Sequence, residues 1–416
     1  MKLIQPFRGL RPPPELAQAV SAPPYDVINR KEAKVFAAGN PHSFLHVSKA
    51  EIDLPEHVES GDPLVYETAR RRLESMVRSG FLLADSEPCL YLYRLEMAQR
   101  QQLGLVATAS VNSYQSGRIK KHEFTRPDKE EDRTRLALSL QAHTGPVFLI
   151  HRPNSGVHAA TQAAMDGAER LYDFTGGDAI RHTFWRIPDP VRIADLVNAF
   201  EALDYVYIAD GHHRSAAAVR VCEGRRNQPD PPPWDASVNR FLSVLFPSDQ
   251  VRILDYNRVV RDLHGYTPES FLDALRTRFF VSPATDPVKP QTKRCFGLYL
   301  RQVGWFRLEI KPEVQLSPDS LPQDRLDVSL LSQHLLEPIL GIHDPRRDSR
   351  IDFVGGIRGM EGLMNQVDAN EMAAGFSLCP TDLEELMLVA DADQVMPPKS
   401  TWFEPKLRDG LIIQTF

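Results

Sequence analysis

The sequence predicts a mixed α/β (α+β) fold, and three observations support this class. Segments with helical spacing alternate with short apolar segments that are typical of strands. The composition is that of a folded globular chain, with 42% hydrophobic and 25% charged residues. The 33 prolines cluster between these segments and do not form a low-complexity region. At 416 residues, the chain is long enough for two or three domains.

The elements expected in the first 260 residues alternate in type along the chain. Residues 66–80 have helical spacing and end in a glycine, and the helix at 128–146 carries acidic residues in its first turn. Residues 204–209 show no polar alternation, which predicts a strand buried on both faces. A helix follows from His212 to about Glu223, with Gly224 as its expected stop. The other expected strands are 88–97 paired with 102–111, 147–151, and 240–247 paired with 251–260.

A second group of elements follows residue 260. Residues 295–301 and 304–310 are expected to form a hairpin, and 326–342 an amphipathic helix. A further helix over 380–395 is expected to begin with a capping box of Thr381 and Glu384. We therefore predict a core domain over residues 1–260 and an additional C-terminal α/β lobe over 261–416.

Charge and cysteine usage exclude several classes of protein. The formal net charge is −6 and no basic arm is present, which argues against nucleic acid or an anionic membrane as the main partner. The four cysteines are far apart, so a structural zinc site is not expected. No apolar segment of about eighteen residues occurs, and we expect a cytoplasmic protein with a small-molecule substrate. A homo-oligomer is left open.

The segment YVYIADGHHRSAAAVR, residues 205–220, is the first candidate site. Asp210 ends the buried strand, Gly211 permits a tight turn, and His212, His213 and Arg214 fall in the first turn of the helix. A helix N-terminus stabilises an anion, and an arginine fork suits phosphate oxygens. The alternative is that Asp210 only caps the helix. Neither a dinucleotide-binding motif nor a Walker motif occurs. An ordinary Rossmann or P-loop nucleotide site is therefore not expected.

The second candidate is RIKKHEFTRPDKEEDR, residues 118–133. Lys120, Lys121, His122 and Glu123 precede a helix, and a carboxylate beside two lysines and a histidine suits a general base near phosphate. We take Glu123 as the candidate base, with His122 and His212 as further catalytic candidates. The alternative is a solvated charged segment leading into a capped helix.

Two further segments supply candidate binding residues. The segment MPPKSTWFEPKLRDGL contains cations and hydroxyls that suit phosphate oxygens, namely Lys399, Ser400, Thr401 and Lys406. Through this segment the C-terminal lobe is expected to contribute to the site, in one cleft with residues 120–125 and 210–214. The alternative for the MPPKSTWFEPKLRDGL segment is a C-terminal strand with exposed lysines.

The substrate-binding candidates lie near the N-terminus and in the second candidate segment. They are Arg8, Tyr25, Asp26 and Arg133, of which the first three lie in irregular backbone, where binding residues are common. A structural role is the alternative for the N-terminal residues.

Seven ordered segments resemble the bacterial and archaeal family known as domain of unknown function 1015. They run through nearly the whole chain and are PFRGLRP, APPYDV, NPHSFLHV, KKHEFTRPDKEEDR, YIADGHHRSAAA, LDVSLL and MPPKSTWFEPKLRDGL. The DGHHR block is also similar to the phosphate-binding turn of the ParB and sulfiredoxin superfamily, which includes nucleotide-dependent kinases of free L-serine. This similarity implies a ParB/sulfiredoxin-like core.

The same similarity implies roles for individual residues. Asp210, Gly211, His212 and Arg214 would hold phosphate, with His213 at the position where the kinases vary. Those kinases use a glutamate as base, and Glu123 is assigned here by its chemistry and not by a motif match. Sulfiredoxins carry a reactive cysteine in this block, which is histidine here, so cysteine redox chemistry is disfavoured.

The expected function is phosphoryl transfer from a nucleotide or other phosphate donor, such as ATP, ADP or pyrophosphate, to a small hydroxyl acceptor. The resemblance makes free L-serine the first acceptor to consider. Mg²⁺ is expected to bridge phosphate oxygens, held by Asp210 or another carboxylate. A nucleotide-binding regulatory protein and a phosphate-ester hydrolase are the alternatives.

Overall fold

The computed structural model describes residues 2–233, 236–314, 316, 319–369 and 372–416, and the chain divides into two compact units. Unit 1 comprises Met1–Val251 and Pro405–Phe416, and unit 2 comprises Arg252–Glu404. Each unit combines helices with a β-sheet, so the predicted mixed α/β class is confirmed. Within the described residues, no helix is both long and apolar enough to cross a membrane.

The division of the chain differs from a single boundary at residue 260. That residue ends β14 (Tyr256–Val260), which pairs with β18 (Ile351–Gly355) and β19 (Ala374–Leu378) inside unit 2. The last residues return to unit 1, where β21 (Ile413–Thr415) pairs with β2 (Gly9–Arg11). Backbone hydrogen bonds between strands far apart in sequence therefore decide which residues belong to which unit.

Unit 1 contains a nine-stranded mixed sheet, counted over the described residues, in the order β6-β11-β8-β12-β5-β4-β10-β9 with β1 beside β5. Its strands are β1 (Ile4–Gln5), β4 (Leu90–Met97), β5 (Arg100–Ser110), β6 (Ile119–Lys120), β8 (Val147–His151), β9 (Glu169–Thr175), β10 (Arg181–Ile187), β11 (Val206–Asp210) and β12 (Arg240–Pro247). A smaller sheet joins β2 and β21 to β3 (Leu83–Ala84) and β7 (Ala142–His143).

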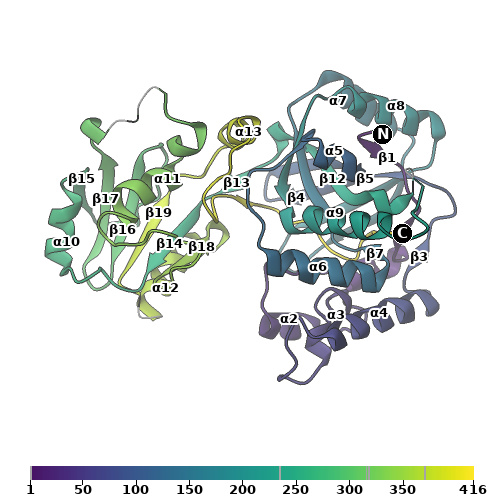
Figure 1. Cartoon of the computed structure of the whole chain (residues 1–416), viewed down its shortest axis with the longest axis horizontal. Coiled ribbons are helices and arrows are strands. Elements are labelled where there is room, and N and C mark those ends of the chain that lie inside the picture. The colour runs from purple at the N-terminus through teal and green to yellow at the C-terminus, as the bar shows by residue number, and fades with distance from the viewer. Residues whose placement is uncertain (1, 234–235, 315, 317–318, 370–371) are drawn as a thin grey trace. The chain divides into compact units, whose positions relative to one another are not determined.

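The helices of unit 1 are α1 (Ala17–Val20), α2 (Arg30–Ala37), α3 (Leu45–Ser48), α4 (Pro63–Arg78), α5 (Val111–Gln115), α6 (Pro127–Leu140), α7 (Ser155–Met165), α8 (Pro190–Glu201) and α9 (His212–Arg226). Helices α9, α6 and α4 form one group and α7 and α8 another (Figure 1). Helix α9 packs on α6, α6 packs on α4, and α7 packs on α8. Ala217 and Ala218 of α9 are buried, which lets this helix lie close to its neighbours. The start of α9 is therefore held in a fixed position by packing.

Unit 2 is built on a sheet in the order β15-β17-β16-β19-β14-β18. Its other elements are β13 (Ile253–Leu254), α10 (Pro268–Leu275), β15 (Phe279–Ala284), β16 (Cys295–Leu300), β17 (Gly304–Ile310), α11 (Asp327–Leu331), α12 (Gly359–Ala369), α13 (Leu383–Asp391) and β20 (Trp402–Phe403). The core beneath α12 includes Val259, Leu363 and Val367.

Two of the predicted strand pairs are confirmed and one is wrong. β4 pairs with β5, and β16 with β17, both antiparallel. The expected pair of 240–247 with 251–260 does not form, because β12 pairs with β5 and β8, whereas β14 pairs inside unit 2. The three residues between the predicted strands read as a hairpin loop, but they form a short 3₁₀ turn at which the chain leaves the main sheet.

Three predicted helix details are wrong. Helix α9 continues through Gly224 to Arg226, because a glycine inside a packed helix is tolerated. The capping box of α13 is formed by Asp382 and Glu385, one residue beyond the predicted pair. The helix expected over 326–342 is α11 followed by a π-helical turn, Ser332–Leu336.

Candidate functional site

The turn between β11 and α9 has the predicted strand, glycine and helix order. Gly211 has φ of +97°, a left-handed conformation that favours glycine, and it forms the N-cap of α9. No side chain of the described residues caps this helix, so the alternative role of Asp210 as a cap is wrong. The register between β11 and β8 shifts between Ile208 and Asp210. Such an irregularity changes the direction in which a side chain points. Here it lies at the end of β11.

Asp210 forms ion pairs with two cations of unit 1. Lys406 Nζ donates a hydrogen bond to Asp210 Oδ2 at 2.8 Å, and Arg214 Nη2 lies 3.7 Å from Oδ1. Burial by itself would raise the pKa of Asp210, but these cations outweigh it and hold the pKa well below its usual range. Lys406 thus lies next to Asp210, although it is 196 positions away in sequence.

Arg214 is buried at the start of α9 and faces several carboxyl groups. Its Nη1 donates to the carbonyl of Pro146, and its Nε forms no hydrogen bond with any described residue. Burial would lower the pKa of Arg214, but the carboxylates of Asp26, Asp210 and Asp409 raise it. The guanidinium therefore stays charged in a region with little water.

Asp409 is a buried carboxyl group that the sequence analysis did not single out. A Cβ atom on Gly145 would lie 3.0 Å from Asp409 Oδ1 and 3.2 Å from Arg214 Cδ, so both side chains pack closely against this glycine. Burial raises the pKa of Asp409 to about 7, although Arg214 opposes the shift. Its Oδ1 has no hydrogen-bond partner among the described residues. Asp409 therefore carries a proton at mildly acidic pH.

We expect Asp409→Asn to change how stability depends on pH. The folded chain keeps this proton up to about pH 7, whereas an unperturbed aspartate releases it near 3.8, so wild-type stability falls as pH rises between these values. The amide cannot ionise. The melting temperature of the variant minus that of wild type should therefore be larger at pH 8 than at pH 5. Thermal unfolding at both values tests this, with exposed Asp204→Asn as control. An equal difference at both pH values would contradict it.

A small cavity of about 40 Å³ lies beside Arg214 and Asp409. Two predicted substrate residues, Tyr25 and Arg133, line it, and the Arg133 guanidinium lies 3.9 Å from the centre of the Tyr25 ring. Of the other two predicted residues, Asp26 is exposed next to Tyr25. Arg8 is exposed with its guanidinium 3.8 Å from Glu87, and it is not among the residues that line this cavity.

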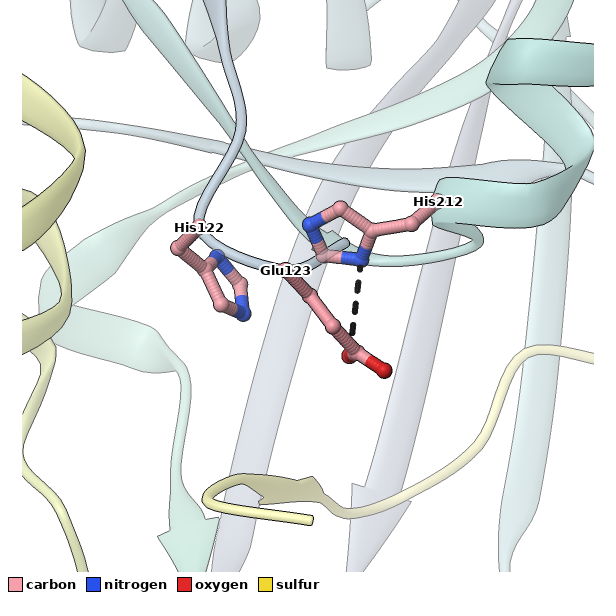
Figure 2. A group of neighbouring side chains, drawn as sticks. All are labelled: His122, Glu123 and His212. Atoms are coloured by element: carbon pink, nitrogen blue, oxygen red, sulfur yellow. Dashed lines mark ion pairs between the residues drawn. The ribbon is translucent and has the colours of Figure 1, made fainter. Parts of the chain in front are cut away.

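His122, Glu123 and His212 lie together (Figure 2). His212 reaches in from the start of α9, and the other two come from the loop between β6 and α6. The imidazole rings of His122 and His212 meet edge to face at 4.5 Å, and His212 Nδ1 lies 3.9 Å from Glu123 Oε2. One donor atom from each residue lies within 4.8 Å of the others, so this group can hold a metal ion.

Both histidines are buried, whereas Glu123 is partly exposed. Burial lowers the pKa of His122 to about 4 and the pKa of His212 well below its usual value, because it disfavours the charged ring. Both nitrogens of His122 and Nε2 of His212 lack a hydrogen-bond partner of normal geometry among the described residues. The backbone of Ile208 is nevertheless close enough to His122 to oppose the lowering of its pKa. At neutral pH, the rings therefore present uncharged nitrogen atoms beside a carboxylate.

The neighbouring predicted residues Lys120, Lys121 and His213 make contacts of their own. Lys120 Nζ lies 4.8 Å from the centre of the Tyr205 ring, and Lys121 Nζ lies 5.0 Å from that of Tyr114. His213 Nε2 accepts a hydrogen bond from the backbone N–H of Arg126 at 3.1 Å, which ties the start of α9 to the loop.

Lys399, Ser400 and Thr401 belong to unit 2, and their contribution to the site stays a prediction. Lys399 has φ of +56°, and its Nζ lies 5.7 Å from the centre of the Tyr256 ring. Ser400 is buried and donates to the carbonyl of Pro397 at 2.6 Å.

His143 is a second residue that the sequence analysis missed. It lines the cavity, and burial lowers its pKa to about 4. Asp409 could have been found from its place in the same motif as Lys406. No local pattern marks His143, which follows the end of α6.

Comparison with solved structures finds eight similar chains, and three of them illustrate the range. A free serine kinase variant in complex with AMP is 14% identical with a TM-score of 0.37, over 72% of this chain and 86% of that chain. A conserved hypothetical protein from Pyrococcus furiosus is 14% identical with a TM-score of 0.36, over 74% and 95%. SbnI from Staphylococcus aureus, truncated at its C-terminus, is 9% identical with a TM-score of 0.39, over 73% and 85%.

Comparison with curated proteins finds no match. The family model described as "Protein of unknown function (DUF1015)" matches residues 4–329, which is most of the chain. The resemblance is thereby confirmed for the five sequence segments up to residue 218 and for the start of the sixth, whereas the segment over 396–411 lies outside the match. The chain belongs to the DUF1015 family.

Proposed function

We propose that this protein transfers a phosphoryl group from a nucleotide or other phosphate donor to a small hydroxyl acceptor. The observation that carries the proposal is the start of α9, where Arg214 and Lys406 flank a helix N-terminus next to the carboxylate of Glu123. Phosphoryl transfer depends on positioning and on neutralising charge, which cations and helix N–H groups supply.

Glu123 would act as the base in this reaction. The acceptor oxygen attacks the terminal phosphorus of the donor, the bond from that phosphorus to the leaving oxygen breaks, and Glu123 takes the hydroxyl proton. Its partial exposure leaves the carboxylate accessible to an acceptor. Free L-serine is the first acceptor to test, because the Asp210–Arg214 block is similar to that of the free serine kinases.

Mg²⁺ would supply charge neutralisation on the donor phosphates when bound. The carboxylate of Asp210 is already paired with Lys406 and Arg214, so it fits such an ion only if it gives up part of that pairing. Phosphate oxygens and water would then provide most of the ligands, as is usual for Mg²⁺.

An unbiased metabolite assay tests the proposal. The protein is incubated with Mg²⁺, a pool of small metabolites and ATP, ADP or pyrophosphate in separate reactions, and mass spectrometry searches for a new phosphate ester. We expect an ester of a small hydroxyl compound, with serine measured first. Release of inorganic phosphate alone would instead indicate a hydrolase, and donor binding without any product would indicate a regulatory protein. Either result would overturn the transferase proposal.

A further inference from the structure

We propose that His122, Glu123 and His212 form a binding site for one divalent transition-metal ion of the Zn²⁺ class. The ion is distinct from any Mg²⁺ that accompanies a phosphate donor, and the proposal does not depend on phosphoryl transfer. It uses the carboxylate of Glu123, which could not act as the base while it binds the ion. It rests on the grouping of the three donor atoms within 4.8 Å and on the unpaired, buried ring nitrogens (Figure 2).

The unpaired nitrogens call for a partner. His122 is 2% exposed and His212 is 5% exposed, and three of their four ring nitrogens have no hydrogen-bond partner among the described residues. Buried polar atoms without partners are rare in folded proteins, because each gives up its hydrogen bonds to water on folding. A metal ion binds one nitrogen of each ring, so it would give His122 a partner that it lacks. On His212 it would bind Nδ1, the nitrogen that faces Glu123.

The donor set selects the kind of ion. Imidazole nitrogen suits Zn²⁺ and its transition-metal neighbours, whereas Mg²⁺ and Ca²⁺ prefer sites made of oxygen. Two histidines and one glutamate are three protein ligands, and a three-ligand zinc site keeps a further position open. That position would be taken by water or another small oxygen ligand.

The geometry requires only small movements for binding. Zinc–nitrogen bonds are about 2.0–2.1 Å long, so the donor atoms need to move inward by less than about an ångström. Glu123 is partly exposed, whereas the histidines are held by packing. His212 is fixed by helix α9, and His122 is fixed by its contact with the His212 ring. An ion would reach the site from the exposed side of Glu123.

Metal titration of the full chain tests the site without any phosphate compound. Protein lacking a histidine tag is stripped with a chelator, and Zn²⁺ is titrated by calorimetry. We expect one ion per chain and a melting temperature that rises with bound Zn²⁺. Co²⁺ should give the intense visible absorption bands of a four-coordinate site. Absence of binding, or a Co²⁺ spectrum typical of six oxygen ligands, would overturn the proposal.

Three variants and one control assign the ligands. His122→Ala, His212→Ala and Glu123→Ala should each weaken Zn²⁺ binding by at least about 100-fold, since loss of a ligand exceeds the usual cost of losing a supporting contact. His213→Ala is the control, because His213 is the next residue on α9 but bonds to the backbone of Arg126. Its affinity should stay within a few-fold of wild type.

The variants also keep the proposal open to refutation if one of them fails to fold. Glu123 is partly exposed, so Glu123→Ala is the variant expected to keep the fold even if a histidine variant does not. Undiminished Zn²⁺ binding in a folded Glu123→Ala or His212→Ala chain would overturn the assignment, as would an equal loss in His213→Ala. Because only the metal is present, failure here is distinct from failure of the phosphoryl-transfer proposal.

Discussion

Glu123→Gln should lower turnover by about 10²–10⁴-fold if Glu123 is the general base, because the amide cannot accept the proton of the acceptor hydroxyl. Binding of the phosphate donor should stay close to normal, since the substitution keeps the size of the side chain and leaves Arg214 and Lys406 in place. Turnover by mass spectrometry and donor binding by calorimetry give the two measurements.

Two controls make this result interpretable. Glu131→Gln is the same substitution on α6, where Glu131 pairs with Arg135 and Arg220 at the surface, and it should leave turnover unchanged. Metal content measured on each preparation separates loss of the base from loss of a metal ligand. Turnover of Glu123→Gln within a few-fold of wild type would exclude Glu123 as the base, and Asp26 would be the next carboxylate to replace.

Arg214→Ala should lower turnover by about 10²–10³-fold, because one well-placed donor to the charge of the transition state contributes about that much. Donor binding should weaken as well, since the guanidinium is buried at the start of α9 beside the cavity. Calorimetry with each donor and the product assay measure the two effects. Arg220→Ala provides the control on the same helix, as Arg220 pairs with Glu131 at the surface.

The loss of Arg214 also affects folding, so a second substitution is needed. Arg214 faces Asp210 and Asp409, and its removal leaves these carboxyl groups with fewer cations around them. Arg214→Lys keeps the charge but not the planar fork, and should retain stability better than the alanine variant while still binding phosphate weakly. Normal donor binding and turnover in a folded Arg214→Ala chain would exclude the phosphate role.

Local chemistry made part of the site predictable. The buried strand, the glycine turn and the helix start at 206–214 follow from an apolar segment that ends in Asp and Gly, because these features act over a few residues. The same holds for the hairpins of β4 with β5 and of β16 with β17. The ends of helices were predicted less well, because tertiary packing can extend a helix past a glycine. Helix α9, for example, continues beyond Gly224.

Long-range contacts made the rest unpredictable. The pair of Lys406 with Asp210 and the approach of Asp409 to Arg214 both join the C-terminal residues to the start of α9. Nothing in the local pattern indicates that β21 returns to unit 1, or that β12 and β14 belong to different sheets. Such contacts depend on how the whole chain buries its apolar surface.

The sequence by itself determined the family, the mixed α/β class and the strand–turn–helix that holds Asp210, Gly211 and Arg214. Only the tertiary structure decided which groups surround that turn. Burial set the protonation of Asp409 and of the two histidines, since a charged group loses its hydration when the chain folds over it. The grouping of His122, Glu123 and His212 likewise arises from folding, because it brings a loop onto the start of a helix some 90 residues later.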